Sequence, residues 1–319
     1  MQIANSRDLE DWKVKCENDP SIPLFLTYTW MNIVAKNEWN VILSKTGEGE
    51  IVGAWVYMEK HKYLISGFLN PILTPYSGLY YFLPSDIYKE ASKADFYKKV
   101  TRDLLDKLPK YTLLVLRCHQ SLKDLQELHW AGFRSTVKYT YMLQNQDVDN
   151  CYQGFDSKLR NDISKASLKT KISDSDDVAE LYDFCLSTFE RQQRKITYTL
   201  PYMKAIYEGL VHQGRSKLYV ASRNNKNVAS LMIVKDKHTA YCLASGYNEH
   251  AERGTMGLLM WQAIKDSFEE GLDFDFEGSD LKGVEHFYRG FGASLVPIYK
   301  ISHACNKFMD VVLLLAGKI

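Results

Sequence analysis

Acidic residues alternate with apolar ones in the segment 272-LDFDFEGS-279. Alternate side chains of a strand point to opposite faces, so Asp273, Asp275 and Glu277 are expected on one face. A carboxylate in a cleft can acquire a raised pKa and act as a general base or hold an ammonium group. We predict that Glu277, nearest the end of the strand where α/β sheets bind ligands, is catalytic, and that Asp275 and Ser279 contact substrate. The alternative is a solvated strand face.

A helix is expected after this strand, and it carries Tyr288 four residues before Gly292. A phenol with a pKa near 10 can act as a general acid, and a general acid of this kind contributes roughly 10²- to 10⁴-fold in rate. Tyr288 is therefore the second predicted catalytic residue, and a hydrogen-bonded core tyrosine is the alternative.

Two glycines stand at the start of a helix expected over residues 255–269. Free N–H groups and the helix dipole at such an end suit an anionic donor, so Gly254 and Gly257 are predicted to bind it, with Arg253 adding a positive charge. The alternative is that these glycines only permit a turn.

Basic residues also cluster in 191-RQQRK-195 and along one face of the helix expected over 154–171. They are candidates for holding phosphates of tRNA or of a nucleotide-linked acceptor, and a solvated helix face is the alternative. In the first half of the chain, Tyr76 between Pro75 and Gly78 is predicted to stack on substrate, with a turn-anchoring role as the alternative.

The overall charge is almost balanced, with 40 basic and 39 acidic residues and a formal net charge of +1. No global field attracts nucleic acid, so a nucleic-acid-binding role is disfavoured and any polyanion site must be local. The six cysteines are scattered, with no CxxC pair and no spacing suited to zinc. We expect no metal and a reduced, cytoplasmic environment.

Neither end of the chain predicts a membrane segment. The start, MQIANSRDLEDWK, lacks the order of a signal peptide, and the apolar run 308-FMDVVLLLAG-317 is about half as long as a spanning helix of roughly 20 residues. A terminal helix over residues 304–319 that docks on the body is the expectation.

The length of 319 residues favours two domains, predicted at 1–145 and 146–303. Each half shows a run of antiparallel strands, a helix, a buried strand, a short helix with a nearby glycine and a closing strand. The expected fold class is α/β (α+β), with two tandem domains that each have a mixed, mostly antiparallel sheet flanked by helices. This order indicates a duplication.

The order of these elements resembles the GNAT acyltransferase superfamily, and the doubling resembles its FemAB-like branch, the Fem-type aminoacyl transferases that act on peptidoglycan precursors. The segments that carry the resemblance are 76-YSG-78, 158-KLRNDISKA-166, 253-RGTMGLLMWQAIKDSFEEG-271, 275-DFEGS-279 and 287-FYRGFG-292. The resemblance implies a cytoplasmic acyltransferase whose acceptor is an amine, for example on a cell-wall or polysaccharide precursor. It also implies that Arg191 and Arg194 contact substrate.

Two departures from the family pattern leave the donor open. Tyr288 follows Phe287 where tRNA-dependent Fem-type enzymes have lysine, and it instead resembles the tyrosine of CoA-dependent members. The loop at Arg253 has the residues of a pyrophosphate loop but not its spacing. Acyl-CoA and aminoacyl-tRNA are therefore both candidate donors.

The first half has Leu128 four residues before Gly132, where the second half has Tyr288. We infer that the first domain is a degenerate copy that shapes the acceptor groove. His119, His129 and His286 have no partner spacing that indicates a metal site or a nucleophile triad. A non-catalytic binding module for a precursor remains the second hypothesis for the whole chain.

Overall fold

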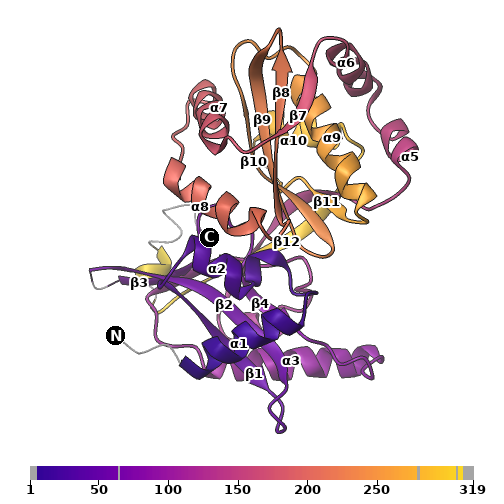
Figure 1. Ribbon diagram of the computed structural model, residues 1–319. Coiled ribbons are helices and arrows are strands. Elements are labelled where there is room, and N and C mark those ends of the chain that lie inside the picture. Colours follow the sequence, from indigo (N-terminus) through magenta and orange to yellow (C-terminus); the bar gives the residue numbers. More distant parts are fainter. Residues whose placement is uncertain (1–5, 64, 279–280, 307, 312–319) are drawn as a thin grey trace. The chain divides into compact units, whose positions relative to one another are not determined.

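The structure, a computed structural model, describes residues 6–63, 65–278, 281–306 and 308–311. Its contacts divide the chain into two units, Met1–Lys138 with Pro297–Ile319, and Tyr139–Val296. Each unit has a mixed, mostly antiparallel sheet flanked by helices (Figure 1). The predicted fold class is confirmed.

The strands of the first unit are β1 (Trp39–Lys45), β2 (Ile51–Lys62), β3 (Ile65–Leu69), β4 (Gly78–Tyr81), β5 (Leu113–Arg117) and β12 (Ser294–Ala304). They follow the order β1-β2-β3-β5-β12, with β4 paired to β2. The β3–β5 pair is parallel and three residues long, from Gly67 opposite Leu113 to Leu69 opposite Val115. All other pairs described within this unit are antiparallel.

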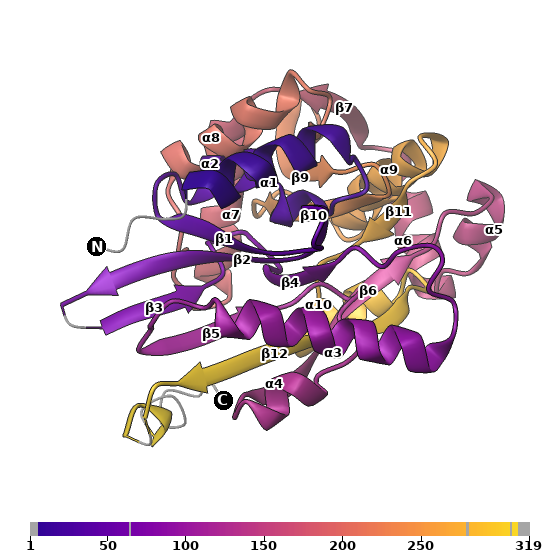
Figure 2. The same ribbon diagram turned by 90° about the horizontal axis from the view of Figure 1, so that it is seen from below.

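The helices of the first unit are α1 (Ser6–Asn18), the 3-10 helix η1 (Leu24–Leu26), α2 (Tyr28–Val34), α3 (Glu90–Asp106) and α4 (Gln126–Trp130). Figure 2 shows α3 running along the sheet, and α3 contacts β1 and β2. Trp55, Phe68 and Leu114 from three strands are fully buried in one cluster with Leu104 of α3. Burial of this apolar surface is the main force that holds the unit together.

The strands of the second unit are β6 (Arg134–Leu143), which enters this unit at Tyr139, β7 (Lys171–Ser175), β8 (Ser216–Arg223), β9 (Lys226–Lys235), β10 (Thr239–Tyr247) and β11 (Asp273–Asp275). Their order is β6-β11-β10-β9-β8-β7. The β10–β11 pair is parallel, and the others described in this unit are antiparallel.

Helices cover both faces of this sheet. They are α5 (Val148–Gln153), α6 (Ser157–Ser167), α7 (Val178–Arg191), α8 (Leu200–Val211), α9 (Thr255–Glu269) and α10 (Lys282–Arg289). Figure 1 shows α7 and α8 on one face of the β8–β10 strands and α9 on the other, with α6 packed on α9. The position of each helix follows from its apolar stripe, as in α9, where Leu259, Met260, Ala263 and Ile264 are fully buried.

The parallel pairing of β10 with β11 ends early. It covers only Thr239 to Tyr241 on β10, opposite Asp273 to Asp275 on β11. Beyond this point β10 continues to Tyr247, paired with β9 on its other side and with its register shifted after Cys242. β11 ends at Asp275, so the carboxyl-terminal half of β10 continues without it as a partner, and the carboxyl ends of strands are where α/β sheets place ligands.

The predicted domain boundaries at 145/146 and 303/304 differ from the two compact units in the placement of residues 139–145 and 297–303. The boundaries stay a prediction. Of the helix expected over 304–319, residues 308–311 are helical, and 307 and 312–319 lie outside the described residues. Among the described helices, none has both the length and the apolar character needed to cross a bilayer.

Gly246 tests the packing that supports this half of β10. A Cβ built there would lie 2.3 Å from the carbonyl carbon of Phe184 and 2.4 Å from its oxygen, both in the backbone of α7. Gly246→Ala should lower the free energy of unfolding by about 3 kcal/mol, because neither backbone can yield freely. Gly47→Ala, where nothing lies within 4 Å of the added Cβ, is the control and should change it by less than about 0.5 kcal/mol. Urea unfolding measures the free energy of unfolding of both variants. Equal values for Gly246→Ala and Gly47→Ala would contradict the close contact between β10 and α7.

Candidate active site

The start of α9 lies directly against α6. Gly254 has φ +89°, which favours glycine, and an added Cβ would lie 2.2 Å from the carbonyl oxygen of Asp162. One helical turn further along α9, the side chains of Leu159 and Ile163 of α6 lie next to the position that a Cβ on Gly257 would occupy. The first N–H groups of a helix have no acceptor within the helix, and the dipole makes this end positive. Gly254 and Gly257, the two glycines predicted to bind the donor, therefore lie at a helix end that suits an anionic group.

Arg253 is exposed beside this helix end, and its Nε donates to Oδ2 of Asp162 over 2.8 Å. The pair neutralises part of the charge predicted to attract the donor. Lys158 of α6 and Lys282 of α10 face the same space, and neither forms an ion pair within the described residues. These two lysines supply the unpaired positive charge there.

Asp275 lies at the end of β11 in a tight hydrogen-bonded turn. Its Oδ1 accepts from the backbone N of Glu277 over 2.7 Å and from the hydroxyl of Thr140. The same hydroxyl accepts from the backbone N of Gly278 over 3.1 Å. A Cβ on Gly278 would lie 1.9 Å from the carbonyl oxygen of Tyr139, so only glycine fits. Asp275 therefore links the end of β11 to β6.

The expected polar face of this strand is not found. Asp275 is 8% exposed, and Phe274 and Phe276, which point to the opposite face, are buried as well. β11 is a central strand, paired along one edge with β10 and along the other with β6, and helices commonly cover both faces of such strands in α/β sheets. Burial raises the pKa of Asp275 to about 6, against the opposing effect of the hydrogen bonds from Thr140 and Glu277.

Glu277 follows Asp275 in an unusual backbone conformation. Its φ of +57° lies in the left-handed region, which costs a residue other than glycine on the order of 1 kcal/mol. Its side chain is partly exposed, and its charge contributes to raising the pKa of the Tyr288 phenol. The turn thus holds Glu277 within electrostatic reach of Tyr288, the other residue predicted to be catalytic.

Tyr288 projects from α10 and lines a cavity. Its ring packs 5.1 Å from that of Phe276, centroid to centroid. Burial is the main cause that raises its pKa well above the usual value, followed by electrostatic interactions with Cys242, Glu277 and Asp275. The phenol therefore keeps its proton at neutral pH, as a general acid must before it acts.

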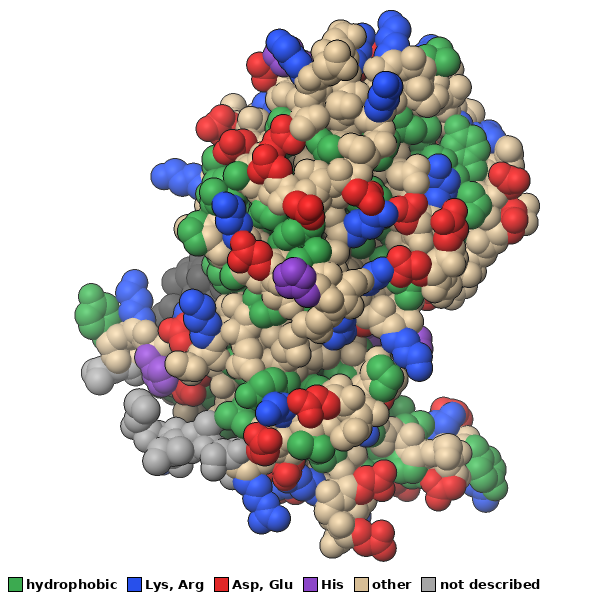
Figure 3. All heavy atoms as spheres, in the orientation of Figure 1, with side chains coloured by type: hydrophobic (Ala, Val, Ile, Leu, Met, Phe, Trp, Pro, Cys, Tyr) green, Lys and Arg blue, Asp and Glu red, His purple; other side chains and the backbone are tan. Residues whose placement is uncertain are grey.

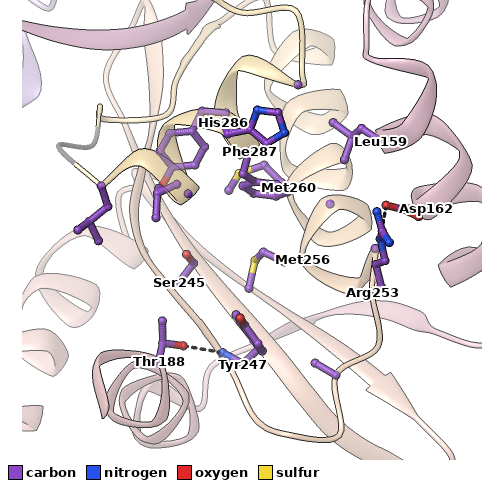
Figure 4. A pocket seen from close by; sticks show the side chains of 18 of the residues that line it. Leu159, Asp162, Thr188, Ser245, Tyr247, Arg253, Met256, Met260, His286 and Phe287 are labelled. Atoms are coloured by element: carbon purple, nitrogen blue, oxygen red, sulfur yellow. Dashed lines mark hydrogen bonds and ion pairs between the residues drawn. The ribbon is translucent and has the colours of Figure 1, made fainter. Parts of the chain in front are cut away.

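The cavity lies entirely within the second unit and has a volume of about 1000 Å³. It is bounded by α6, the end of α7, the parted half of β10, the start of α9 and α10. Figure 4 shows the hydrogen-bonded Thr188 and Tyr247 at one side and the Arg253–Asp162 pair at another, with Met256 between them in this view. Arg253, Gly254, Gly257 and Tyr288 all line it, whereas Asp275 and Glu277 are not among its lining residues.

Arg191 stands at the edge of this cavity. Its guanidinium lies 4.0 Å from the centre of the Tyr247 ring and donates to the carbonyl oxygen of Tyr247 over 2.7 Å and to Oγ1 of Thr188 over 2.9 Å. Thr188 and Tyr247 both line the cavity. Arg191 is thus fixed next to the space, with part of its guanidinium exposed.

The remaining predicted substrate contacts lie elsewhere. Arg194 follows α7, is exposed and is not among the lining residues. Tyr76 belongs to the first unit and is buried, with its ring 5.0 Å from Phe25 and 4.6 Å from His119. Ser279 lies outside the described residues. The roles of all three stay predictions.

Several lining residues were not predicted from the sequence. Ser245 and Tyr247 reach the cavity because β10 parts from β11, and Met256 and Met260 because they share one face of α9. Spacing by four residues was the available signal for the two methionines, but an apolar helix face more often marks core. His286 also lines the cavity, and its Nδ1 lies 3.1 Å from a guanidinium nitrogen of Arg289. Within the described part of the chain, no group of three or more His, Cys, Asp or Glu side chains is arranged to hold a metal ion.

Residues 157–289 match the family model described as "Acetyltransferase (GNAT) domain". Among solved structures, FemX is similar over 98% of this chain and 99% of its own, with a TM-score of 0.71 and 12% identity. L-PGS from Bacillus licheniformis gives a TM-score of 0.58 at 14% identity over 99% and 98% of the two chains. A tandem GNAT protein from the clavulanic acid biosynthesis pathway gives 0.51 at 12% identity over 94% of each.

No curated protein matches the sequence. The family match and the fold agree with the resemblance seen in the sequence motifs. The segment that matches the GNAT model lies within the second unit, and the fold of the chain is similar to that of FemX and of the tandem GNAT protein.

The buried carboxyl of Asp275 predicts a pH effect on stability. The folded protein keeps this proton up to about pH 6, whereas the ordinary pKa is 3.8. Between these values the folded state binds more protons than the unfolded state, so this group's contribution to stability falls as pH rises, by on the order of 3 kcal/mol in all. Asp275→Asn keeps an oxygen to accept from Thr140 and Glu277 but cannot titrate.

Urea unfolding of both proteins between pH 4 and pH 8 measures this effect. The free energy of unfolding of the natural protein, minus that of Asp275→Asn, should fall by on the order of 3 kcal/mol between pH 4 and pH 8. A difference that stays constant with pH would show that the carboxyl does not titrate in this way.

Proposed function

We propose that the second unit transfers an acyl group from a thioester such as acyl-CoA to an amine. One observation carries the proposal: a phenol that stays protonated at neutral pH, Tyr288, lines a cavity of about 1000 Å³ that also receives the positive end of α9. An anionic donor would rest its phosphates at Gly254 and Gly257. Its thioester would then lie deeper, near Tyr288.

The reaction needs two proton transfers. The amine nitrogen attacks the acyl carbon, a C–N bond forms and the C–S bond breaks. The amine loses a proton, for which we propose Glu277 as acceptor through an intervening water because its side chain does not line the cavity, and the departing thiolate takes a proton from Tyr288. Solvent removes the proton from Glu277 and returns one to Tyr288, so the products are an amide and a free thiol.

Acyl-CoA is favoured over aminoacyl-tRNA as the donor for three reasons. A polyanion as large as tRNA calls for a broad basic surface, but the chain is nearly neutral, and on the face that Figure 3 shows basic and acidic side chains are interspersed. The tandem GNAT protein from the clavulanic acid pathway is described in a form "without AcCoA", which associates such a fold with a CoA donor. Tyr288 in place of a lysine points the same way.

The acceptor is proposed from the resemblance to Fem-type enzymes. It would be an amine on a cell-wall or polysaccharide precursor, and Arg191 at the cavity edge would contact it. The reaction would take place in the cytoplasm, where the scattered free cysteines stay reduced.

Isothermal titration tests the donor. CoA and acetyl-CoA should bind with measurable heat, and Lys158→Ala should weaken binding by about threefold because an exposed charge next to the phosphates is lost. Lys169→Ala is the matched control, since Lys169 is also exposed but does not line the cavity. No heat with CoA at millimolar concentration, together with binding of aminoacyl-tRNA, would reverse the donor assignment.

Tyr288→Phe tests catalysis directly. It should lower kcat by roughly 10²- to 10⁴-fold and leave CoA binding nearly unchanged, because only the acid is removed. Tyr152→Phe is the control: its hydroxyl donates to the carbonyl oxygen of Arg160 over 3.3 Å, and it does not line the cavity. Thiol release with a trapping reagent measures both. If acceptor binding is found without turnover, and Tyr288→Phe has no effect, the chain is a binding module.

A further inference from the structure

Apolar side chains form the cavity wall near Tyr288. Met260 is fully buried, and Met256 lies one turn earlier on the same side of α9. Val284 and Phe287 of α10 line the same cavity. Figure 4 shows Met256 standing in the cavity and Met260 next to Phe287. Acyl transfer alone does not require this apolar wall.

Polar residues also line the cavity: Lys158, Asp162 and Arg253 belong to α6 or to the segment before α9, whereas Lys282 and His286 belong to α10. Arg253 is paired with Asp162, and Lys158 is exposed. On the strand side, Ser245 offers a hydroxyl. A bound water needs two to four polar partners, so water next to the methionines would be poorly held. Displacing such water with an apolar group gains affinity.

The cavity has to hold part of the donor as well as the group that is transferred. At about 1000 Å³ the cavity is at the upper end of the range of roughly 300–1,000 Å³ found for pockets that hold drug-sized ligands. Methionine side chains are flexible and polarizable, so they adapt to chains of different shape.

We propose that the group transferred is an apolar acyl chain longer than acetyl, received by Met256, Met260, Val284 and Phe287. This inference rests on the proposed acyl transfer and specifies its substrate class. The hydrocarbon part of the acyl group does not react. The C–S bond of the acyl carbonyl breaks and the C–N bond forms, as for any acyl group. The methionines act as specificity-determining residues.

A series of thioesters tests the inference. Acetyl-, butanoyl-, hexanoyl- and octanoyl-CoA are titrated into the full chain, and thiol release is followed with each. Affinity should rise roughly fourfold per buried methylene until the cavity is filled, and kcat/KM should favour a longer chain over acetyl. Acetyl-CoA binding as tightly as the longer thioesters and reacting fastest would overturn the inference while leaving the proposed acyl transfer intact.

Two variants locate the effect. Met260→Trp should shift the preference towards shorter chains, and Met260→Ala, which adds no bulk, should shift it towards longer ones. Met232→Ala is the matched control, because Met232 of β9 is also fully buried but does not line the cavity. Equal chain-length preferences in Met260→Ala and Met232→Ala would refute the assigned wall. If no thioester of any length binds or reacts, it is the proposed function itself that fails.

Discussion

The short parallel contact between β10 and β11 is the constraint on which the candidate site depends. The two strands pair over three residues only, ending at Tyr241 opposite Asp275. Had the pairing continued, the carboxyl-terminal half of β10 would be an interior strand with no room beside it. Because it stops, Ser245 and Tyr247 face a cavity, and α9 and α10 present their side chains to the same space.

This opening is kept in place by close backbone contacts on both sides. Gly246 lets α7 approach β10 and Gly254 lets α6 approach the start of α9, with no space for a Cβ at either position. After the end of β11, Gly278 likewise lies against the carbonyl of Tyr139, with no space for a Cβ. A close-packed scaffold of this kind holds Tyr288 and the start of α9 at a fixed separation, and acyl transfer gains from reacting groups that are already positioned.

Local patterns predicted the elements well and their contacts less well. Helix α9 begins and ends at the predicted residues, 255 and 269, because its apolar stripe is continuous and glycines flank it. The burial of Asp275 could not be read from its neighbours, since its partner Thr140 is 135 residues away and the strands that enclose it come from separate parts of the chain. The alternation of acidic and apolar residues indicates that the strand has two faces, but it does not show whether both faces are buried.

The same reasoning applies to the candidate site. The position of Tyr288 in the cavity agrees with its place in a family motif, because such a motif reflects the fold that the family members share. Met256 and Met260 were not distinguished from core methionines, because a helix that is apolar around most of its circumference gives no sign of which side meets a cavity. That difference arises only when β10 and β11 part.

The first unit shows what happens when the equivalent opening is bridged. Its β3–β5 pair is also parallel and also three residues long, ending at Leu69 opposite Val115. Just beyond that end, Asn70 accepts from the backbone N of Arg117 over 2.8 Å and donates to its carbonyl oxygen over 3.2 Å, while the backbone N of Ser77 donates to the same oxygen over 2.8 Å.

The edges that stay apart in the second unit are thus joined in the first by the chain's own polar groups. The short helix that follows β5 carries Leu128, fully buried, where α10 carries Tyr288. The two units therefore differ at the equivalent place: the residue on the short helix is a buried leucine in the first unit and the cavity-lining Tyr288 in the second.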